Sequence, residues 1–598
     1  MTYVDVKREN NIIKIVERVN GKRIFRKDNL KFVGYYEHPN GTHESFRGKY
    51  YKKIEVEGDY DKFIRKKKKK GITYLYEEDF NPVYRYLYDN YKNKPSPLLN
   101  ICFFDIEVDF DPKLGFAPIE DPSKNRNNDI CYYGEIISIT LYPTWLNELI
   151  TLCRYPKTIE SKHRAMKILD GISNVYVFEN DAELLEVFYE IIENADVVTG
   201  WNSEKYDIPY IVGRTKKVLG ENTTKKLCLY EPYHGWDDLP QKRIIFQHKK
   251  AFLTYTLTGR IHIDYLELYR KHNQQQLQSY RLDFIGEKEV GMKKLPYDGS
   301  LYDLYNNDYR KFIEYNRRDV EILVSIDEKL KFIELANQIA HNNCVLIQTT
   351  MGSVALIEQA IINEAHENNL IVDIRVERKG NKDFENENYF RDDQEEEDEE
   401  DLNSRVAGAY VIEPKKGLHH FVGGVDINSL YPSTIRTLNM GPETLVAQLK
   451  PTYTEKYLIE RMKSENISLT EAAHDLFGSL EYQKVLNRTD DIITVEFEGE
   501  REGEKISLDL KASEIYDLIF SEDSILCLSA NGTIFRKDKQ SIISKLLEKW
   551  YNERKRMQQI SKEYFKIYQS GELSFSELLE YIEEDDFIWF IEEFSKLS

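Results

Sequence analysis

Asp105 and Glu107 are the first residues whose types and spacing suggest chemistry. They lie two positions apart in the apolar run LLNICFFDIEVDF, residues 98–110, which predicts a β-strand. Because side chains alternate along a strand, both carboxylates point to the same face. Two neighbouring buried carboxylates are costly unless cations compensate them, and divalent metals prefer such oxygen ligands. The pair therefore indicates a metal site, with two exposed acids on a half-buried edge strand as the alternative.

Two later segments carry carboxylates that could join this pair. Asp207 precedes Pro209 in the sequence GWNSEKYDIPY, which places it in an extended or helix-capping position. Tyr315 and Asp319 are four residues apart, so they share one face of a predicted helix. Taken singly, the first would be an ordinary helix cap and the second an ordinary surface pair.

In this order, the three segments resemble the Exo I, Exo II and Exo III motifs of the DnaQ-like proofreading domain of family B DNA polymerases. The resemblance implies an RNase H-like 3′–5′ exonuclease domain in which carboxylates hold two Mg²⁺ ions, or Mn²⁺ in their place. The implied catalytic metal ligands are Asp105, Glu107, Asp207 and Asp319. Tyr315 would orient the attacking water or the scissile phosphate.

A further carboxylate, Asp426, lies in the sequence GGVDINSLYPS, residues 423–433. The residues from His419 to Asn428 predict a strand, and the turn after it has backbone N–H groups that can face a phosphate chain. A helix can start at Ser433. The alternative is an ordinary strand–turn–helix segment without a catalytic role.

This segment resembles motif A, DxxSLYPS, of family B polymerases. The resemblance implies that Asp426 binds both polymerase metals and that the Ile427 carbonyl is a further ligand. It also implies that the backbone at Leu430 and Tyr431 contacts the incoming triphosphate. The Tyr431 ring would lie under the sugar and exclude a ribose 2′-OH.

Shorter matches point to the polymerases of T-even-like bacteriophages. The segment Tyr551–Arg556 resembles the first fingers helix, where Arg554 would hold the triphosphate. The other matching segments are Gly408–Val411, Gly441–Leu445, Ser279–Asp283 and Asn531–Asp538. The resemblance covers most of residues 100–440 and 525–560 and is weak before residue 100.

The elements that must position these residues predict a multidomain protein of mixed α/β and α+β class. Strands are expected at 135–141, 175–178 and 196–199, and an amphipathic helix at 181–194. The resemblance implies five regions. They are an N-terminal domain (1–99 with 332–390), the exonuclease domain (100–331), an acidic linker (391–401), a partial palm (402–539, with an insertion near 452–510) and partial fingers (540–598).

Composition and charge limit the class of protein. The 598 residues are 41% hydrophobic and 31% charged, which argues against disorder as the main state. No apolar run approaches the roughly 20 residues that span a bilayer, so no membrane is expected as partner. The net charge of −20 conceals two opposite blocks, Arg65–Lys70 and Asp392–Asp401, both expected to be solvated loops. An acidic protein with a separate basic groove is still compatible with nucleic acid.

The polymerase motifs are incomplete within the 598 residues. Neither motif B (KxxxNSxYG) nor motif C (a DTDS turn) follows Asp426, and one carboxylate cannot hold two metals. One interpretation is a natural split, in which a second polypeptide carries motifs B and C and the thumb. The other is a truncated piece of a full-length polymerase that acts only as an exonuclease. A capping-box pattern at Ser574–Glu577, with apolar residues behind it, favours the split.

The resemblances together imply the N-terminal subunit of a split phage replicative DNA polymerase with 3′–5′ proofreading activity. Its partners would be primer-template DNA, single-stranded DNA, dNTPs and the second chain, in the cytoplasm of the infected bacterial host. The competing hypothesis is a non-catalytic subunit that only binds DNA or a partner protein. The set of four exonuclease carboxylates argues against it, because a binding module needs no metal cage.

Overall fold

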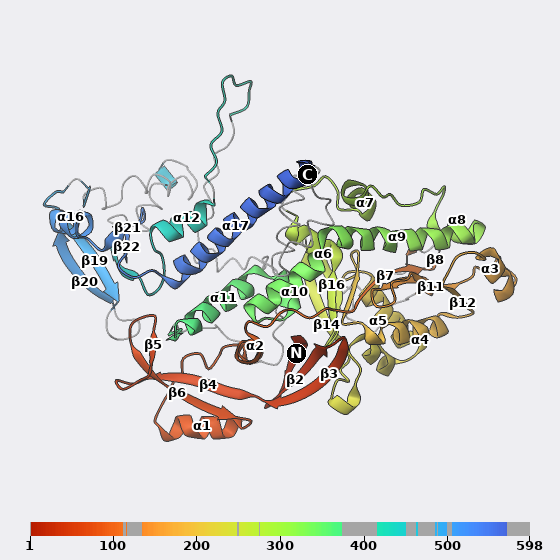
Figure 1. The fold of residues 1–598 in the computed structure, drawn as a ribbon, viewed down its shortest axis with the longest axis horizontal. Coiled ribbons are helices and arrows are strands. Elements are labelled where there is room, and N and C mark those ends of the chain that lie inside the picture. Colours follow the sequence, from red (N-terminus) through yellow and green to blue (C-terminus); the bar gives the residue numbers. More distant parts are fainter. Residues whose placement is uncertain are drawn as a thin grey trace.

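In the computed structural model the protein is elongated, and different segments of the chain form its two ends (Figure 1). Most of the segment 100–330 forms one end, the segment 430–540 forms the other, and residues 2–99 with 332–371 lie between them. The structure describes residues 2–111, 115–116, 134–247, 250–273, 275–373, 415–427, 429–449, 462–464, 485–486, 488–498 and 505–570. Within these ranges, no helix has both the length and the apolar character needed to cross a bilayer.

A six-stranded sheet carries the first pair of carboxylates. Its strand order is β12-β11-β10-β7-β13-β16, with β7 antiparallel to β10 and parallel to β13. The strands are β7 (Ile101–Val108), β10 (Ile136–Pro143), β11 (Ile150–Arg154), β12 (Val175–Phe178), β13 (Val197–Gly200) and β16 (Ile261–Asp264). The predicted strands in this region are therefore confirmed to within three residues.

Helices cover both faces of this sheet (Figure 1). The even positions of β7, from Cys102 to Val108, pack in one core with α4 and α5, whereas Phe103 packs on the opposite face with Leu323 of α9. Asp105 and Glu107 therefore lie on the α9 face, as the alternation predicts. The helices of this unit are α3 (Lys162–Ile168), α4 (Asp181–Ile191), α5 (Asp207–Val218), α6 (Tyr265–His272), α7 (Leu282–Val290), α8 (Leu301–Asn307) and α9 (Tyr309–Leu330). A hairpin of β14 (Gln241–Gln247) and β15 (Lys250–Thr256) completes it.

The middle unit has two sheets, ordered β1-β2-β3 and β17-β5-β6-β4. β17 pairs in parallel with β5, so residues more than 300 positions apart share one sheet. The strands are β1 (Thr2–Glu9), β2 (Ile12–Val19), β3 (Lys22–Asn29), β4 (Lys31–Glu37), β5 (His43–Ser45), β6 (Tyr50–Glu57) and β17 (Leu370–Ile371). The helices are α1 (Tyr60–Lys69), α2 (Pro82–Tyr91), α10 (Phe332–Asn343) and α11 (Ser353–Glu367).

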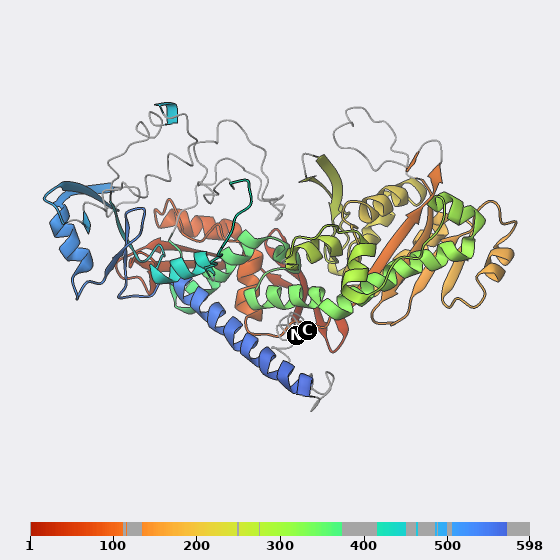
Figure 2. The same cartoon turned by 90° about the horizontal axis from the view of Figure 1, so that it is seen from above.

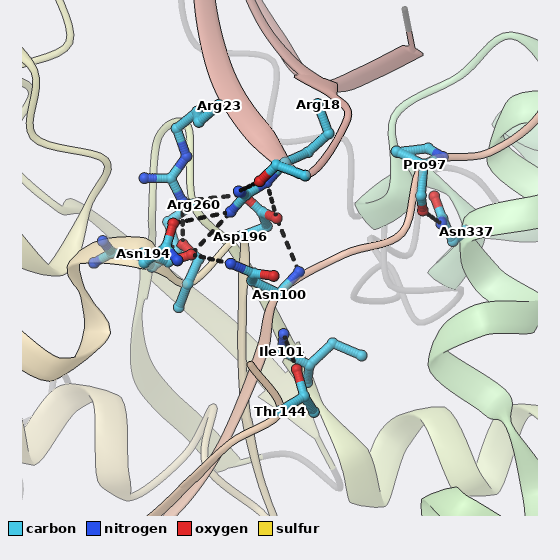
Figure 3. Close-up of polar contacts among 12 residues, drawn as sticks. Arg18, Arg23, Pro97, Asn100, Ile101, Thr144, Asn194, Asp196, Arg260 and Asn337 are labelled. Atoms are coloured by element: carbon cyan, nitrogen blue, oxygen red, sulfur yellow. Dashed lines mark hydrogen bonds and ion pairs between the residues drawn. The ribbon is translucent and has the colours of Figure 1, made fainter. Parts of the chain in front are cut away.

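A buried ion-pair network joins the β2–β3 hairpin to the six-stranded sheet (Figure 3). The Asp196 carboxylate accepts from Arg18 Nε at 2.8 Å and from Arg23 at 3.0 Å. It also accepts from the backbone N–H of Asn100 at 2.9 Å. Asn100 directly precedes β7 and Asp196 directly precedes β13, so two guanidinium groups fix the starts of both strands. Arg260, fully buried beside them, donates to the Ala195 carbonyl.

The remaining unit is built on an antiparallel five-stranded sheet of order β20-β19-β18-β22-β21. α16 packs on this sheet, and the long helix α17 packs against α12 and α11 (Figure 2). The strands are β18 (Leu445–Leu449), β19 (Ile492–Glu498), β20 (Lys505–Lys511), β21 (Leu526–Leu528) and β22 (Thr533–Arg536). The helices are α12 (Leu430–Thr437), α16 (Ala512–Phe520) and α17 (Ile542–Ser570). The described part of the expected 452–510 insertion thus contributes two strands to the sheet.

Two expectations about local structure are wrong. Residues 415–427 contain no strand and are solvent-exposed, because no described strand lies beside them to supply hydrogen bonds; the helix after them starts at Leu430 rather than Ser433. Arg65–Lys70 is not a loop, because residues up to Lys69 belong to α1. Capping by Asp59, burial of Phe63 and the favourable position of cations in a last turn stabilise this helix.

Three other expectations concern residues that the structure does not describe. They are the acidic block Asp392–Asp401, the match at Gly408–Val411 and the capping-box pattern at Ser574–Glu577. These stay predictions.

Candidate active site and metal centre

Three carboxylates meet where β7 packs against α9. Oxygen atoms of Asp105, Glu107 and Asp319 all lie within 4.8 Å of one another. The first two come from one face of β7, and Asp319 comes from the helix that covers this face. Within the described ranges, no other group of three potential metal ligands comes together in this way. The fold thus brings residues more than 200 positions apart into one acidic cluster.

Burial and mutual repulsion disfavour ionisation of these acids. Burial, reinforced by the charge of Asp319, raises the pKa of Asp105 to about 7. The pKa of Glu107 is raised by burial and then by Asp105, and burial also raises the pKa of Asp319. A site that concentrates negative charge at this energetic cost is typical of metal-binding and catalytic centres.

Lys294 is the positive charge closest to the cluster. Its Nζ donates to Asp319 Oδ2 at 2.5 Å and to the Tyr315 hydroxyl at 3.2 Å. Burial lowers the pKa of Lys294, but Asp319 and Tyr315 outweigh this effect, so the net pKa is raised and the ammonium persists. No sequence pattern indicated this residue, because it lies in the loop after α7, 25 positions before Asp319.

Asn316 fixes the position of Asp105. Its side-chain amide donates to Asp105 Oδ2 at 2.7 Å, while its Oδ1 accepts from Ser138 Oγ at 2.9 Å and from Thr140 Oγ1 at 2.6 Å. Asn316 is fully buried, and its partners lie on β10, the neighbour of β7. Sequence reasoning missed it as well, although its place between Tyr315 and Asp319 in one helix was an available signal.

Asp207 borders the cluster but is not one of the three acids that meet. It is the first residue of α5, and its Oδ1 accepts from the backbone N–H of Ile106 at 3.2 Å. Burial and the charge of Asp105 raise its pKa. Asp207 therefore lies beside β7 at Ile106, within electrostatic reach of Asp105.

The cluster fits a divalent cation with oxygen ligands. Asp319 Oδ1 is buried and has no hydrogen-bond partner in the described part of the chain, so one lone-pair acceptor stays unsatisfied. Three carboxylates face a single ammonium group, and a hard cation would relieve the repulsion between them. Mg²⁺ and Mn²⁺ are the biological cations that suit such a donor set.

The polymerase-like residues are not gathered in this way. Asp426, Ile427, Leu430 and Tyr431 are all exposed. Asp426 belongs to no group of three potential ligands in the described ranges, so the residues present there do not fit a two-metal site. Arg554 is exposed on α17, a helix that packs against α12.

Two segments of the chain match protein families, one containing Asp105 and Glu107 and the other containing Asp426. Residues 23–285 match the description "DNA polymerase family B, exonuclease domain", and residues 344–566 match "DNA polymerase family B". Two of the three clustered carboxylates, Asp105 and Glu107, lie inside the first match, and Asp319 lies beyond its end.

Similar proteins include phage and archaeal polymerases. The DNA-directed DNA polymerase of Escherichia phage RB69 is 26% identical over 409 residues, which are 67% of this chain and 42% of the relative. That of Enterobacteria phage T4 is 27% identical over 295 residues, or 49% of this chain and 29% of the relative. The DNA polymerase of Thermococcus litoralis is 24% identical over 389 residues, or 63% and 19%. The match therefore spans less than half the length of each of these relatives. The two family matches together show that the chain belongs to DNA polymerase family B.

Proposed function

We propose that this chain removes nucleotides from the 3′ end of DNA and so provides the proofreading exonuclease of a replicative DNA polymerase. The observation that carries the proposal is the cluster of Asp105, Glu107 and Asp319, whose oxygens lie within 4.8 Å of one another. Asp105 and Glu107 lie in the region that matches the exonuclease domain of family B, and Asp319 lies 34 positions beyond its end. Single-stranded 3′ ends are the expected substrate.

Asp105, Glu107 and Asp319 would hold divalent cations, with Mg²⁺ the first candidate and Asp207 available at the border of the cluster. Bound cations would supply an activated water and stabilise the leaving 3′ oxygen. The family itself is generally dependent on divalent metals, and the carboxylate cluster supports the same dependence here.

The chain's other residues orient this chemistry. Asn316 holds Asp105 in one rotamer by tying it to β10. Lys294 donates to Asp319, which opposes the rise in the pKa of Asp319 that burial causes, and it places a positive charge where a phosphate would approach. The Tyr315 hydroxyl, which accepts from Lys294, can donate to the attacking water or to a phosphate oxygen.

The motif A segment would supply one part of a polymerase site. In this proposal Asp426 and the Ile427 carbonyl bind metal, Leu430 and Tyr431 contact the dNTP, and Arg554 holds its triphosphate. The second carboxylate would come from motif C in a separate polypeptide that also carries motif B and the thumb. The exposure of the motif A residues supports a site completed by further elements. Action in the cytoplasm of an infected bacterium follows from the phage relatives.

The decisive experiment compares matched double variants in the degradation of 5′-labelled single-stranded DNA with Mg²⁺. Asp105→Ala with Glu107→Ala should lower the rate by about 10³-fold or more, because the two carboxylates act as one unit. Glu186→Ala with Glu190→Ala removes two exposed carboxylates of α4 in the same domain and should leave the rate unchanged. Equal rates in the two double variants would overturn the assignment.

Primer extension tests the polymerase part separately. The 598-residue chain alone should extend no primer, and addition of a polypeptide with motifs B and C and the thumb should restore extension. An Asp426→Ala variant should abolish the restored extension and spare the nuclease. Extension by the chain alone that survives Asp426→Ala would refute the role of motif A.

A further inference from the structure

The exposed face of α1 carries a concentration of positive charge that the proposed active sites do not use. Lys62, Arg65, Lys66 and Lys69, here called the basic face, are all exposed, in a protein of net charge −20. The opposite side of α1 is anchored by the buried Phe63, whose ring lies 6.1 Å from that of Phe32. The helix is thus fixed to the β4–β6 sheet and directs its cations to solvent.

The spacing of the basic face makes it a single stripe. Arg65 and Lys66 follow Lys62 by three and four positions, and Lys69 follows them by four and three, so the four residues lie on one side of the helix and repel one another. The negative end of the helix dipole attracts the cations of the last turn and so accounts for them. It does not account for Lys62, which lies in the first turn, where the dipole disfavours a cation. The position of Lys62 and the repulsion among the four cations therefore offset part of the stability that the cap and the last turn give the helix, and a polyanion bound along the basic face would relieve that repulsion.

In the described part of the chain, nearby acids offset only a small part of the charge on this face. Asp59 uses its side chain to cap the backbone N–H of Lys62, and its carboxylate is 3.9 Å from the Arg65 guanidinium. Glu55 is paired with Lys53, and only its carbonyl accepts from Lys66. Asp61 is the one acid within the helix itself.

An aromatic ring lies at the start of the same helix. Tyr60 is 48% exposed, and its ring is 5.1 Å from that of Phe32, which supports it from below. A cationic stripe beside a supported, half-exposed ring is the combination that binds single-stranded nucleic acid, because phosphates pair with the cations and a base can stack on the ring.

We propose that α1 is a second nucleic-acid-binding surface, which holds the phosphate backbone of a single strand along Lys62, Arg65, Lys66 and Lys69. The surface is separate from the exonuclease cluster, since α1 lies at the outer edge of the middle unit and β7 and α9 lie in the unit at the end (Figure 1). The identification of the bound polyanion as a nucleic acid rests on the proposed function.

The test uses two triple variants with the same change in charge. Lys62→Gln, Arg65→Gln and Lys69→Gln remove three cations from α1 and keep a good helix former at each position. The matched control, Lys162→Gln, Arg164→Gln and Lys167→Gln, removes two lysines and one arginine from exposed positions of α3. Binding of labelled 30-nucleotide DNA and RNA strands, a 30-base-pair duplex and polyglutamate is followed by fluorescence anisotropy in EDTA between 50 and 300 mM KCl.

The α1 variant should bind the single strands about 10-fold or more weakly at 100 mM salt, and the slope of log K against log salt should fall by about 2. The α3 variant should match the wild type. Equal single-strand binding by the α1 and α3 variants would overturn the proposal, and so would a larger loss for duplex or polyglutamate than for single strands. Mg²⁺-dependent degradation by the same samples is measured in parallel. Its absence in every sample would overturn the proposed exonuclease and not the α1 surface, whereas unchanged binding with intact nuclease activity would overturn only the α1 surface.

Discussion

Asp105 and Asp426 represent two candidate metal sites of one chain, and they differ in how far each site is assembled. Asp105 lies in the middle of a six-stranded sheet, hydrogen-bonded by Asn316 and surrounded by two further carboxylates. Asp426 lies in a segment without regular structure, next to Val425, which is 97% exposed. The first site brings three carboxylates together, whereas the second offers a single carboxylate in the described ranges.

The difference shows what a metal site requires before the metal arrives. At the first site, neighbouring strands and a covering helix hold the acids together against their repulsion, and burial with the neighbouring carboxylates raises their pKa values. At the second, the apolar residues Leu418, Phe421 and Val422 stay exposed because the described part of the chain places nothing on them. An apolar segment in this state needs partner strands before its aspartate can be positioned.

The largest expected effect concerns the network that fixes the starts of β7 and β13. Asp196→Ala leaves Arg18 and Arg23 without their buried carboxylate, which should lower the free energy of unfolding by about 3–5 kcal/mol. Asp426→Ala, at an exposed position, should change it by less than about 0.5 kcal/mol. Urea unfolding followed by the fluorescence of buried Trp236 measures both; similar values would mean that the two regions are equally constrained.

Removal of Lys294 should have the next largest effect, and only on the assembled site. In Lys294→Met, Asp319 loses its ammonium partner, so metal-free stability at pH 8 should fall by about 1–3 kcal/mol. Nuclease activity should fall about 10–100-fold. Lys293→Met is the matched control, because the exposed ammonium of Lys293 pairs with Glu287 on the surface and not with the cluster. Unfolding with and without Mg²⁺ checks this: Mg²⁺ should restore the stability lost in Lys294→Met.

A smaller effect should appear in the pH dependence of the metal-free protein. The folded pKa of Asp105 is about 7, above its unfolded value, so between about pH 4 and pH 7 the folded state holds a proton that the unfolded state releases. Stability should therefore decrease as pH rises through this window, by about 1–2 kcal/mol between pH 5 and 7 for this group. Asp105→Asn should reduce this decrease by that amount. An unchanged pH profile in the variant would contradict the raised pKa.

Local pattern predicted much of the first site and little of the second. Strand periodicity alone predicts that Asp105 and Glu107 share a face, and helix periodicity alone predicts the same for Tyr315 and Asp319. The structure contains both the strand and the helix. Lys294 could not be predicted, because its contact with Asp319 is set by how the loop after α7 folds back over α9. The strand expected at His419–Asn428 failed for a related reason, since a strand needs neighbours and pattern alone cannot say whether they are present.

The smallest expected effect on the folded chain is that of Tyr431. Its ring is 70% exposed on α12, so Tyr431→Ala should change stability by less than about 0.5 kcal/mol and leave nuclease activity at the wild-type rate. If the ring lies under the sugar of a bound dNTP, the same variant should accept ribonucleotides once motifs B and C are supplied, because the space for a 2′-OH opens. Primer extension with rNTPs and dNTPs in competition measures this. An unchanged preference would show that Tyr431 does not select the sugar, and a loss of nuclease activity would show that the two sites are coupled through the fold.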